Sequence, residues 1–354
     1  MIIIKLWMFV LRRIAILIPT LIGLTLLVFV LIHLQGNNLI LSEYLNPRLT
    51  GQARELAIQR LTQEFHLNQP VYIQYFYWLA QVFSGNFGYT NTPIFSGPVS
   101  TAIVLFLPNT VILSLFAALL IWLIGIPLGV FSAVNRDSAA DQGIRVFSFT
   151  LYSMPIYLIA IALILILGVY TGILPFSGEV SPQLVSGLPW YVNGISYPTH
   201  VLLIDAIIHG DFAVAWNAFL HLIMPALTLA LAVMAGIIRI LRASMLETLE
   251  QDYIKLARAK GVPEKVVNNL HARKSAMLPV VTSFGYTVAG LLGGVVVVET
   301  VFDFPGIGYW TTQALLNDDV GGVMASTLIF GIILVVTTLV LDIIYAIIDP
   351  RIRY

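Results

Sequence analysis

Charge and cysteine are what this sequence has least of. Only 10% of its 354 residues are charged and none is cysteine, whereas soluble domains carry about 25% charged residues. The missing charge predicts a polytopic membrane protein, in agreement with 58% hydrophobic residues and a mean hydropathy of +0.91. Without cysteine there are no disulfides, thiolate nucleophiles or Cys-ligated metals. The net charge of zero gives no support to nucleic-acid binding.

The sequence also lacks the motifs of common catalytic sites. Its six histidines are scattered and none takes the His-x-x-x-His spacing of a zinc site. There is no Gly-x-Ser-x-Gly nucleophile elbow and no Gly-x-x-x-x-Gly-Lys-Ser/Thr phosphate loop. We therefore expect a chain that is not an enzyme, that holds no metal or cofactor, and that has no nucleotide site of its own.

What the sequence does have is apolar runs that approach or exceed the length needed to cross a bilayer, which is about 20 residues. There are six of them, roughly Ile14–Ile32, Ile103–Val134, Ile144–Tyr170, Phe219–Leu241, Val280–Val301 and Gly322–Ile348. A signal peptide is the alternative for the first run, but its apolar region would have only about 7–15 residues. We therefore expect a retained helix. Prolines such as Pro155 and Pro225 predict kinked spans. Neighbouring helices can form hydrogen bonds with the backbone groups that such a kink leaves unpaired.

Basic residues are unevenly distributed among the connections. All but three of the 18 Lys and Arg lie near the chain ends, in 135–145 or in 239–278, and the segments 172–218 and 303–321 hold none. The positive-inside rule then predicts six helices with both termini in the cytoplasm. The expected parts are an N-terminal transmembrane helix, an external helical loop, a five-helix core and a cytoplasmic tail, in the ranges 1–34, 35–98, 99–348 and 349–354.

Two long stretches outside the spans, 35–98 and 174–218, give different amounts of information about their structure. In the external loop we expect a helix over Gln52–Phe65 and another from Asn68, with Pro70 in its first turn. The second is rich in Tyr, Phe and Trp, which is typical of a membrane–water boundary. The segment 174–218 contains Glu179, Asp205 and Asp211 but no recognisable motif.

The polar segment 244–279 predicts a bent pair of short helices. Met245, Leu249, Tyr253 and Leu256/Ala257 recur at helical spacing. Gly261 can adopt the left-handed angles that end a helix, and Pro263 suits the first turn of the next. Such a pair is either a basic amphipathic helix on the membrane surface or a docking element for another protein. The spacing alone leaves both interpretations open.

Two acids lie within or at the ends of apolar spans, where a charge costs about 2.5–3.5 kcal/mol on insertion scales. Both are candidate gate or structural residues. We expect Glu299 near the external end of its helix, where water reaches it, as a hydrogen-bonded or snorkelling acid that fixes the following Phe-Pro-Gly turn. We expect Asp342 near the cytoplasmic interface, paired with a basic residue.

Three blocks of the sequence resemble ABC-transporter permease subunits of the dipeptide/oligopeptide (peptide/nickel) importer family. They are Asp252-Tyr253 through Leu278-Pro279, Glu299-Thr300-Val301-Phe302 through Gly308, and Asp349-Pro350-Arg351. The resemblance implies an all-α type I importer permease whose cytoplasmic coupling loop, 244–279, contacts an ATPase. The implied contact residues are Asp252, Tyr253, Leu256, Ala257, Arg258, Ala259, Lys260, Gly261, Val262 and Pro263, with the loop ending at Leu278 and Pro279. Lys255 and Leu256 depart from the family pattern, which has Glu and, in the peptide branch, Thr nearby.

The same resemblance implies partners and a location. The partners are a second homologous permease, two ATP-binding subunits that hold ATP and Mg, an extracellular substrate-binding protein and membrane lipid, with no nucleic acid. The chain would be a multi-pass protein of the plasma (inner) membrane that imports peptides, or else oligosaccharides or nickel. A non-transporting membrane scaffold and an intramembrane hydrolase are the alternatives from other classes. The hydrolase would need paired catalytic residues at bilayer depth, where the sequence has only isolated acids.

Overall fold

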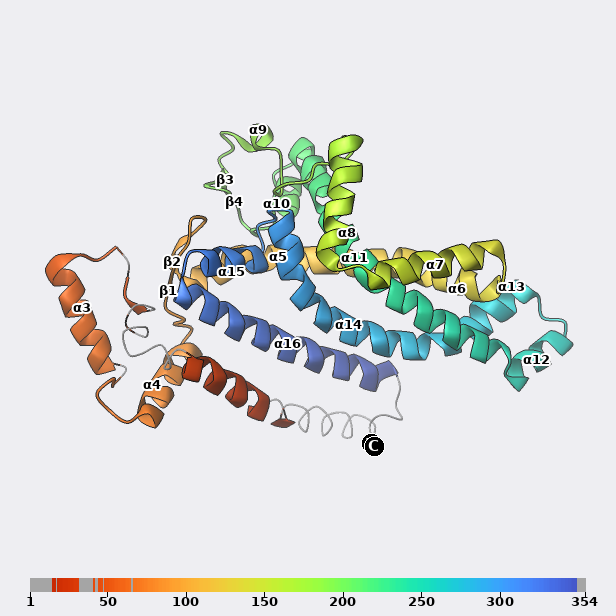
Figure 1. Cartoon of the computed structure of the whole chain (residues 1–354), viewed down its shortest axis with the longest axis horizontal. Coiled ribbons are helices and arrows are strands. Elements are labelled where there is room, and N and C mark those ends of the chain that lie inside the picture. Colours follow the sequence, from red (N-terminus) through yellow and green to blue (C-terminus); the bar gives the residue numbers. More distant parts are fainter. Residues whose placement is uncertain are drawn as a thin grey trace. The chain divides into compact units, whose positions relative to one another are not determined.

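The computed structural model describes residues 15–16, 18–31, 41, 44–46, 48–64 and 66–348. The described chain is mostly helical, with two short antiparallel hairpins (Figure 1). It divides into two compact units, of which one combines Met1–Thr110 with Pro305–Tyr354 and the other is Val111–Phe304. The predicted all-helical membrane class is confirmed at this level of detail. The tail at 349–354 lies outside the described residues.

The first unit is built around aromatic packing between helices. Its elements are an apolar helix Ile18–Leu31, α3 (Gly51–Glu64), α4 (Val71–Phe83), β1 (Tyr89–Asn91), β2 (Ser96–Pro98), the start of α5 (Val99–Leu120), α15 (Ile307–Leu316) and α16 (Val320–Ile348). Phe29 packs edge-on against Tyr75 at 5.3 Å between ring centroids, and Trp78 lies beside both. The hydroxyls of Thr25 and Tyr75 are hydrogen-bonded at 2.9 Å. Tyr75 and Trp78 are therefore core residues of this unit.

The helix predicted over Gln52–Phe65 is confirmed as α3, but the start predicted for α4 is wrong. α4 begins at Val71, and Pro70 is its N-cap with φ −54° and ψ 145°. His66 has a positive φ of 50°, and the N–H of Gln69 donates to its carbonyl at 2.8 Å. This turn contains Asn68 and Gln69. In addition, a residue that precedes proline is sterically disfavoured from helical angles.

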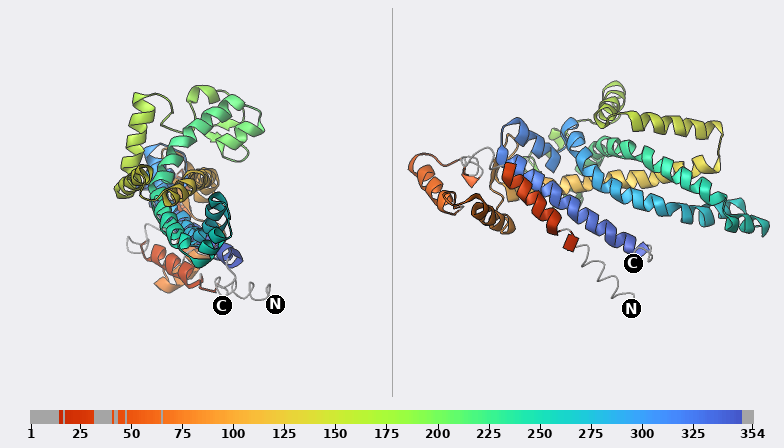
Figure 2. Two further views of the ribbon diagram at one scale, coloured as in Figure 1. Left: turned by 90° about the vertical axis from the view of Figure 1, so that its right-hand side faces the viewer. Right: turned by 60° about the horizontal axis from the view of Figure 1, so that its bottom comes forward.

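The second unit is organised around the long helix α11. Its elements are the end of α5, η1 (Ile121–Gly125, π-helical), α6 (Ile126–Val134), α7 (Ala139–Ser153), α8 (Ile156–Leu163), η2 (Ile164–Tyr170, π-helical), α9 (Pro182–Val185), β3 (Tyr191–Val192), β4 (Ile195–Ser196), α10 (Leu202–Ile208), α11 (Phe212–Leu249), α12 (Asp252–Ala259), α13 (Glu264–Val266), η3 (Val267–Ala272, π-helical) and α14 (Arg273–Val301). α11 packs against α6, α7, α8 and α14 (Figure 2). With 38 residues it is about 57 Å long.

Within the described residues, three helices are long and apolar enough to cross a membrane. They are Val99–Val134, Phe212–Leu249 and Gly321–Leu341. The span predicted as one kinked helix over Ile144–Tyr170 is instead two helices, Ala139–Ser153 and Ile156–Tyr170, at 112° to each other. Met154 adopts an extended conformation with ψ 132° before Pro155, as the steric effect of proline on the preceding residue requires. The break is therefore complete rather than a kink.

Candidate functional site

The 244–279 segment connects α11 to α14 through a short, exposed helix, α12 (Figure 1). α11 ends at Leu249, and Gln251 takes extended angles of φ −69° and ψ 149° before α12 begins at Asp252. Gly261 follows α12 with φ +79°, which confirms the left-handed position predicted there. Pro263 is then the N-cap of α13, with ψ 137°. Two changes of direction, at Gln251 and at Gly261–Pro263, thus set α12 apart from both neighbours.

The predicted lengths of the two short helices are both wrong, because the first is divided in two and the second is much longer than predicted. The first is divided at Gln251, so that Met245 and Leu249 belong to α11. The second is not short, because α13, η3 and α14 follow one another without interruption from Glu264 to Val301. Leu278 and Pro279 therefore lie inside a helix rather than at the end of a loop. The buried residues Val267, Ala272, Ala276 and Val280 show why, since one helical face stays in the core throughout.

α12 has a buried face and an exposed apolar face. Ile254 is fully buried in the same cluster as Met245, with Ala257 and Val262 packed around it. Tyr253 and Leu256 are 46% and 55% exposed. The predicted apolar stripe is therefore wrong here, because the break at Gln251 restarts the helical phase. Residues three apart share a helix face, which places Ile254 with Ala257 inside and Tyr253 with Leu256 outside.

Charged side chains hold the two ends of α12. The guanidinium of Arg258 donates to both carboxylate oxygens of Glu264, at 2.8 and 3.4 Å, across the bend at Gly261. Lys255 lies 2.9 Å from Asp252 and lowers the pKa of that carboxyl by hydrogen bonding and charge. The hydroxyl groups of Tyr253 and Ser275 are 3.0 Å apart. Contacts within the segment thus stabilise the bend, and the side chains of Tyr253 and Leu256 remain partly exposed.

A buried ion pair that the sequence did not reveal ties α7 to α11 close to this segment. Asp141 is fully buried and accepts two hydrogen bonds from Arg242, at 2.8 and 2.7 Å. The hydroxyl of Ser132 donates to it at 2.5 Å, and the N–H of Asp137 at 3.0 Å. Such bidentate pairs fix geometry as well as contributing energy. The Ser138-x-x-Asp141 cap is visible in the sequence, but no local pattern joins it to a residue 101 positions away.

The acid Glu299 occupies a different environment from the one predicted. Its side chain is fully buried in α14, so the expectation that water reaches it there is wrong. Val298, Phe302 and Phe304 form an apolar cluster around the end of that helix. The N–H of Phe304 donates to the Glu299 carbonyl at 2.9 Å, which closes the turn after α14. Asp342 lies in α16, and its side chain is outside the described residues.

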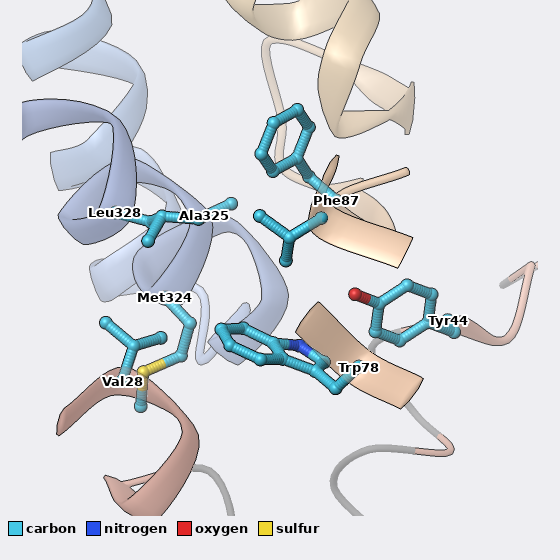
Figure 3. Close-up of a pocket in the computed structure, with 8 residues that line it drawn as sticks. Val28, Tyr44, Trp78, Phe87, Met324, Ala325 and Leu328 are labelled. Atoms are coloured by element: carbon cyan, nitrogen blue, oxygen red, sulfur yellow. The ribbon is translucent and has the colours of Figure 1, made fainter. Parts of the chain in front are cut away.

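The cavity between the first apolar helix, α4 and α16 is too small for a substrate. Figure 3 shows Val28, Trp78 and Met324 converging on it from these helices. Its volume is about 10 Å³, which is close to the space of one water molecule. Among the described residues, no group of three or more His, Asp or Glu could hold a metal ion.

Together, the fold and this segment define a helical membrane protein with a short exposed helix between two long ones. The chain belongs to the family of binding-protein-dependent transport system inner membrane components, which it matches over residues 125–354. It is therefore a membrane permease component of a transport system rather than an enzyme. Membership implies a substrate-binding protein and an ATPase as partners.

The chain is also similar to individual permeases over nearly its whole length. It is 36% identical over 347 residues to the oligopeptide transport system permease protein AppB of Bacillus subtilis (strain 168), covering 98% of this chain and 99% of that protein. It is 34% identical over 349 residues to the dipeptide transport system permease protein DppB of Escherichia coli (strain K12), covering 98% of each. It is 35% identical over 346 residues to the di/tripeptide permease DppB of Pseudomonas aeruginosa (strain UCBPP-PA14), again covering 98% of each.

Proposed function

We propose that the chain is one permease subunit of an ATP-driven importer of peptides and forms half of its translocation pathway. Relatives named as oligopeptide, dipeptide and di/tripeptide permeases, each similar over nearly its full length, support this cargo. The other half would come from a second permease, and two ATP-binding subunits and an external binding protein would complete the assembly. Oligosaccharides and nickel are the alternative cargoes.

The proposed topology has six membrane spans with both termini in the cytoplasm, as the distribution of Lys and Arg predicts. Residues 1–34 would form the first span, 35–98 an external loop, 99–348 the core and 349–354 a cytoplasmic tail. The 38 residues of α11 support one step of this arrangement, because that helix exceeds the thickness of a bilayer. The segment 171–211 precedes it and α12 follows it, so the two would lie on opposite sides.

We propose that α12 is the element that docks into a cleft of the ATP-binding subunit. The observation that carries this proposal is the pair of exposed apolar side chains, Tyr253 and Leu256, directly beside the fully buried Ile254. A helix anchored on one face and bare on the other can transmit force from a partner to the helices behind it. The contact residues from Asp252 to Pro263, with Leu278 and Pro279 in α14, remain the proposed coupling set.

Packing between α12 and the helices behind it supports this role. Ile254 belongs to an apolar cluster that also contains residues of α6, α11 and the helix that runs from Glu264 to Val301, and α12 contacts η3 and α11. The Asp141–Arg242 pair joins α7 to α11 near the same end. Movement of α12 would therefore be transmitted to four helices together. Coupling over such distances is carried by packed side chains and rigid elements.

The docking proposal is tested by removing the exposed side chains from the intact assembly. We expect Tyr253→Ala and Leu256→Ala each to weaken association with the ATP-binding subunit, by about 30-fold if the residue is a central contact worth about 2 kcal/mol. Tyr72→Ala and Leu56→Ala are matched controls, because both residues are 65% exposed in the other unit. Association is measured by titration in detergent or nanodiscs, and stimulated ATPase activity is measured alongside.

Several outcomes decide between the alternatives. If the Tyr253 and Leu256 variants assemble and stimulate ATPase like their controls, α12 is not the docking element. A surface helix would instead lose membrane binding when Lys255 and Arg258 are neutralised.

The permease chain purified alone is expected to hydrolyse no ATP, because its sequence has no phosphate loop. Uptake by the reconstituted complex, with peptides competing against oligosaccharides and nickel, identifies the cargo.

A further inference from the structure

An open groove lies between the end of α6 and the start of the helix that runs from Glu264 to Val301. Its volume is about 390 Å³. One wall is apolar and consists of Pro127, Val130, Phe131 and Val134. These residues belong to the last two turns of the apolar helix Val99–Val134, which is long enough to cross a membrane. The groove is thus placed where a membrane span ends.

The opposite wall is cationic and rich in amides. Lys265 and Arg273 are both exposed and line the groove together with Asn135, Asn268 and Asn269, and no acidic residue lines it. Side-chain amides donate hydrogen bonds, as do ammonium and guanidinium groups. This wall therefore presents two positive charges and several donors to one small space. Its chemistry favours an anionic group with several oxygens, of which phosphate is the common example.

Among the described residues, both cations keep their charge for an external group. In the part of the chain that the structure describes, Lys265 and Arg273 form no ion pair. By contrast, Lys255 pairs with Asp252, Arg258 with Glu264 and Arg242 with Asp141. Lys260 and Lys274 also form no ion pair among the described residues, but they do not line the groove. Lys265 and Arg273 are thus the unpaired cations of this segment that an anion in the groove can meet.

The apolar wall decides which source of phosphate fits. Phe131 is 48% exposed and Val134 is 41% exposed, and both continue the lipid-compatible surface of the helix Val99–Val134. A free phosphate ion would gain nothing from this surface. A glycerophospholipid would place its phosphodiester against the cations and an acyl chain along the helix. Basic pockets between membrane helices on the cytoplasmic side are a general form of lipid headgroup site.

We propose that this groove binds an anionic glycerophospholipid of the surrounding membrane, with the phosphate held by Lys265 and Arg273 and an acyl chain lying along α6. The lipid would join α6 to the start of the long helix just after the bend at Gly261. It would therefore brace the segment that carries α12. This inference concerns the chain's lipid partner and holds for any cargo of the transporter.

The test is a lipid titration of the purified full-length chain, delipidated in detergent and followed by native mass spectrometry. The probes are phosphatidylglycerol, phosphatidylcholine of equal chain length, and glycerol 3-phosphate. We expect phosphatidylglycerol to bind at least about tenfold more tightly than phosphatidylcholine, because its headgroup has a net negative charge that two basic side chains attract, whereas phosphatidylcholine is zwitterionic. The double variant Lys265→Gln/Arg273→Gln should lose that preference.

The matched control is Arg136→Gln/Lys274→Gln, which removes the same charge from exposed residues that neither line the groove nor belong to the proposed coupling set. It should keep the preference for phosphatidylglycerol. Equal losses in the two double variants would mean that general surface charge attracts the lipid, and would overturn the site. Full competition by glycerol 3-phosphate would identify a free-anion site instead. If the Lys265→Gln/Arg273→Gln variant loses association with the ATPase but keeps its preference for phosphatidylglycerol, the groove is a protein interface and the lipid site is overturned.

A second measurement does not depend on how the variants fold. Phosphatidylglycerol with a photoreactive acyl chain is incorporated into nanodiscs with the wild-type chain and crosslinked. The modified peptides should include residues 127–134 in excess over a phosphatidylcholine probe. Crosslinks spread evenly over all lipid-facing helices would show that no bound lipid occupies the groove.

Discussion

Gly261 determines the direction in which the chain leaves α12. Its φ of +79° is in the left-handed region, and nothing lies within 4 Å of the position that an added Cβ would take. A substitution there is therefore opposed by backbone conformation rather than by a clash, at about 1–3 kcal/mol. We expect Gly261→Val to insert and fold, but to lose transport and the stimulation of ATPase by loaded binding protein. Reconstituted uptake and ATPase assays measure both.

Two variants control for this prediction. Gly187→Val imposes the same strain far along the chain, because Gly187 has φ +81° and an equally open surrounding. It should leave assembly with the ATP-binding subunit unchanged. Gly261→Asn should be milder than Gly261→Val, since Asn tolerates left-handed angles better than β-branched residues do. Intact transport and stimulation in Gly261→Val would mean that the bend is not needed for coupling.

Individual residues differ in how far the sequence determines their roles. Gly261 was predictable because helix ends have local chemistry. Ile254 was not, because its burial depends on where the helix phase restarts at Gln251. The Asp141–Arg242 pair depends on tertiary packing that joins α7 to α11. Gly129 is intermediate: its small-residue spacing from Gly125 is common by chance, yet an added Cβ would lie 3.0 Å from Leu241.

Elements were easier to predict than their ends. Long apolar runs and α3 followed from composition and periodicity, which sum over many residues. The boundary at Met154–Pro155 did not, because a proline can cap, kink or break a helix. Pro263 caps a helix, Pro155 separates two helices at 112°, and Pro225 and Pro279 lie inside helices. Only the packing of each helix decides among these outcomes.

The segment between η2 and α11 contains three carboxyl groups, those of Glu179, Asp205 and Asp211, and no Lys or Arg. Asp205 is fully buried and accepts hydrogen bonds from the N–H and hydroxyl of Thr199, at 2.8 and 2.7 Å. Its other carboxylate oxygen has no hydrogen-bond partner among the described residues. Burial and the charge of Asp205 raise the pKa of Glu179 from 4.5 to about 8, against a hydrogen bond from Tyr191 that lowers it.

A pH dependence of this segment follows from Glu179. Because its pKa is higher in the folded state, the folded segment binds more protons between the two pKa values, and stability falls as pH rises. The stabilisation should be complete below about pH 4.5 and lost through about pH 8. Hydrogen exchange of residues 174–218, corrected for the intrinsic rate, measures this. Glu179→Gln should remove the dependence and the exposed Glu55→Gln should keep it. Equal slopes in all three proteins would contradict the assignment.

For the molecule as a whole, the topology rests on two opposite signals at the ends of α11. The segment before it has no Lys or Arg from 172 to 218, and the segment 250–278 after it holds six of them. The absence of cysteine makes this testable directly, because a single introduced thiol is the only one in the chain. Ser186 and Lys274 are both exposed and flank α11 in the sequence.

We expect Ser186→Cys to react with a membrane-impermeant maleimide added to intact cells, and Lys274→Cys to react only after the membrane is permeabilised. The cysteine-free chain supplies the background. Lipid in the groove near Arg273 should not shield Lys274, which does not line it. Reaction of Lys274→Cys alone in intact cells would mean that the orientation is inverted. Reaction of both variants in intact cells would mean that α11 does not cross the membrane. The segment with α12 would then lie on the same side as the binding protein, and α12 would not reach a cytoplasmic ATPase.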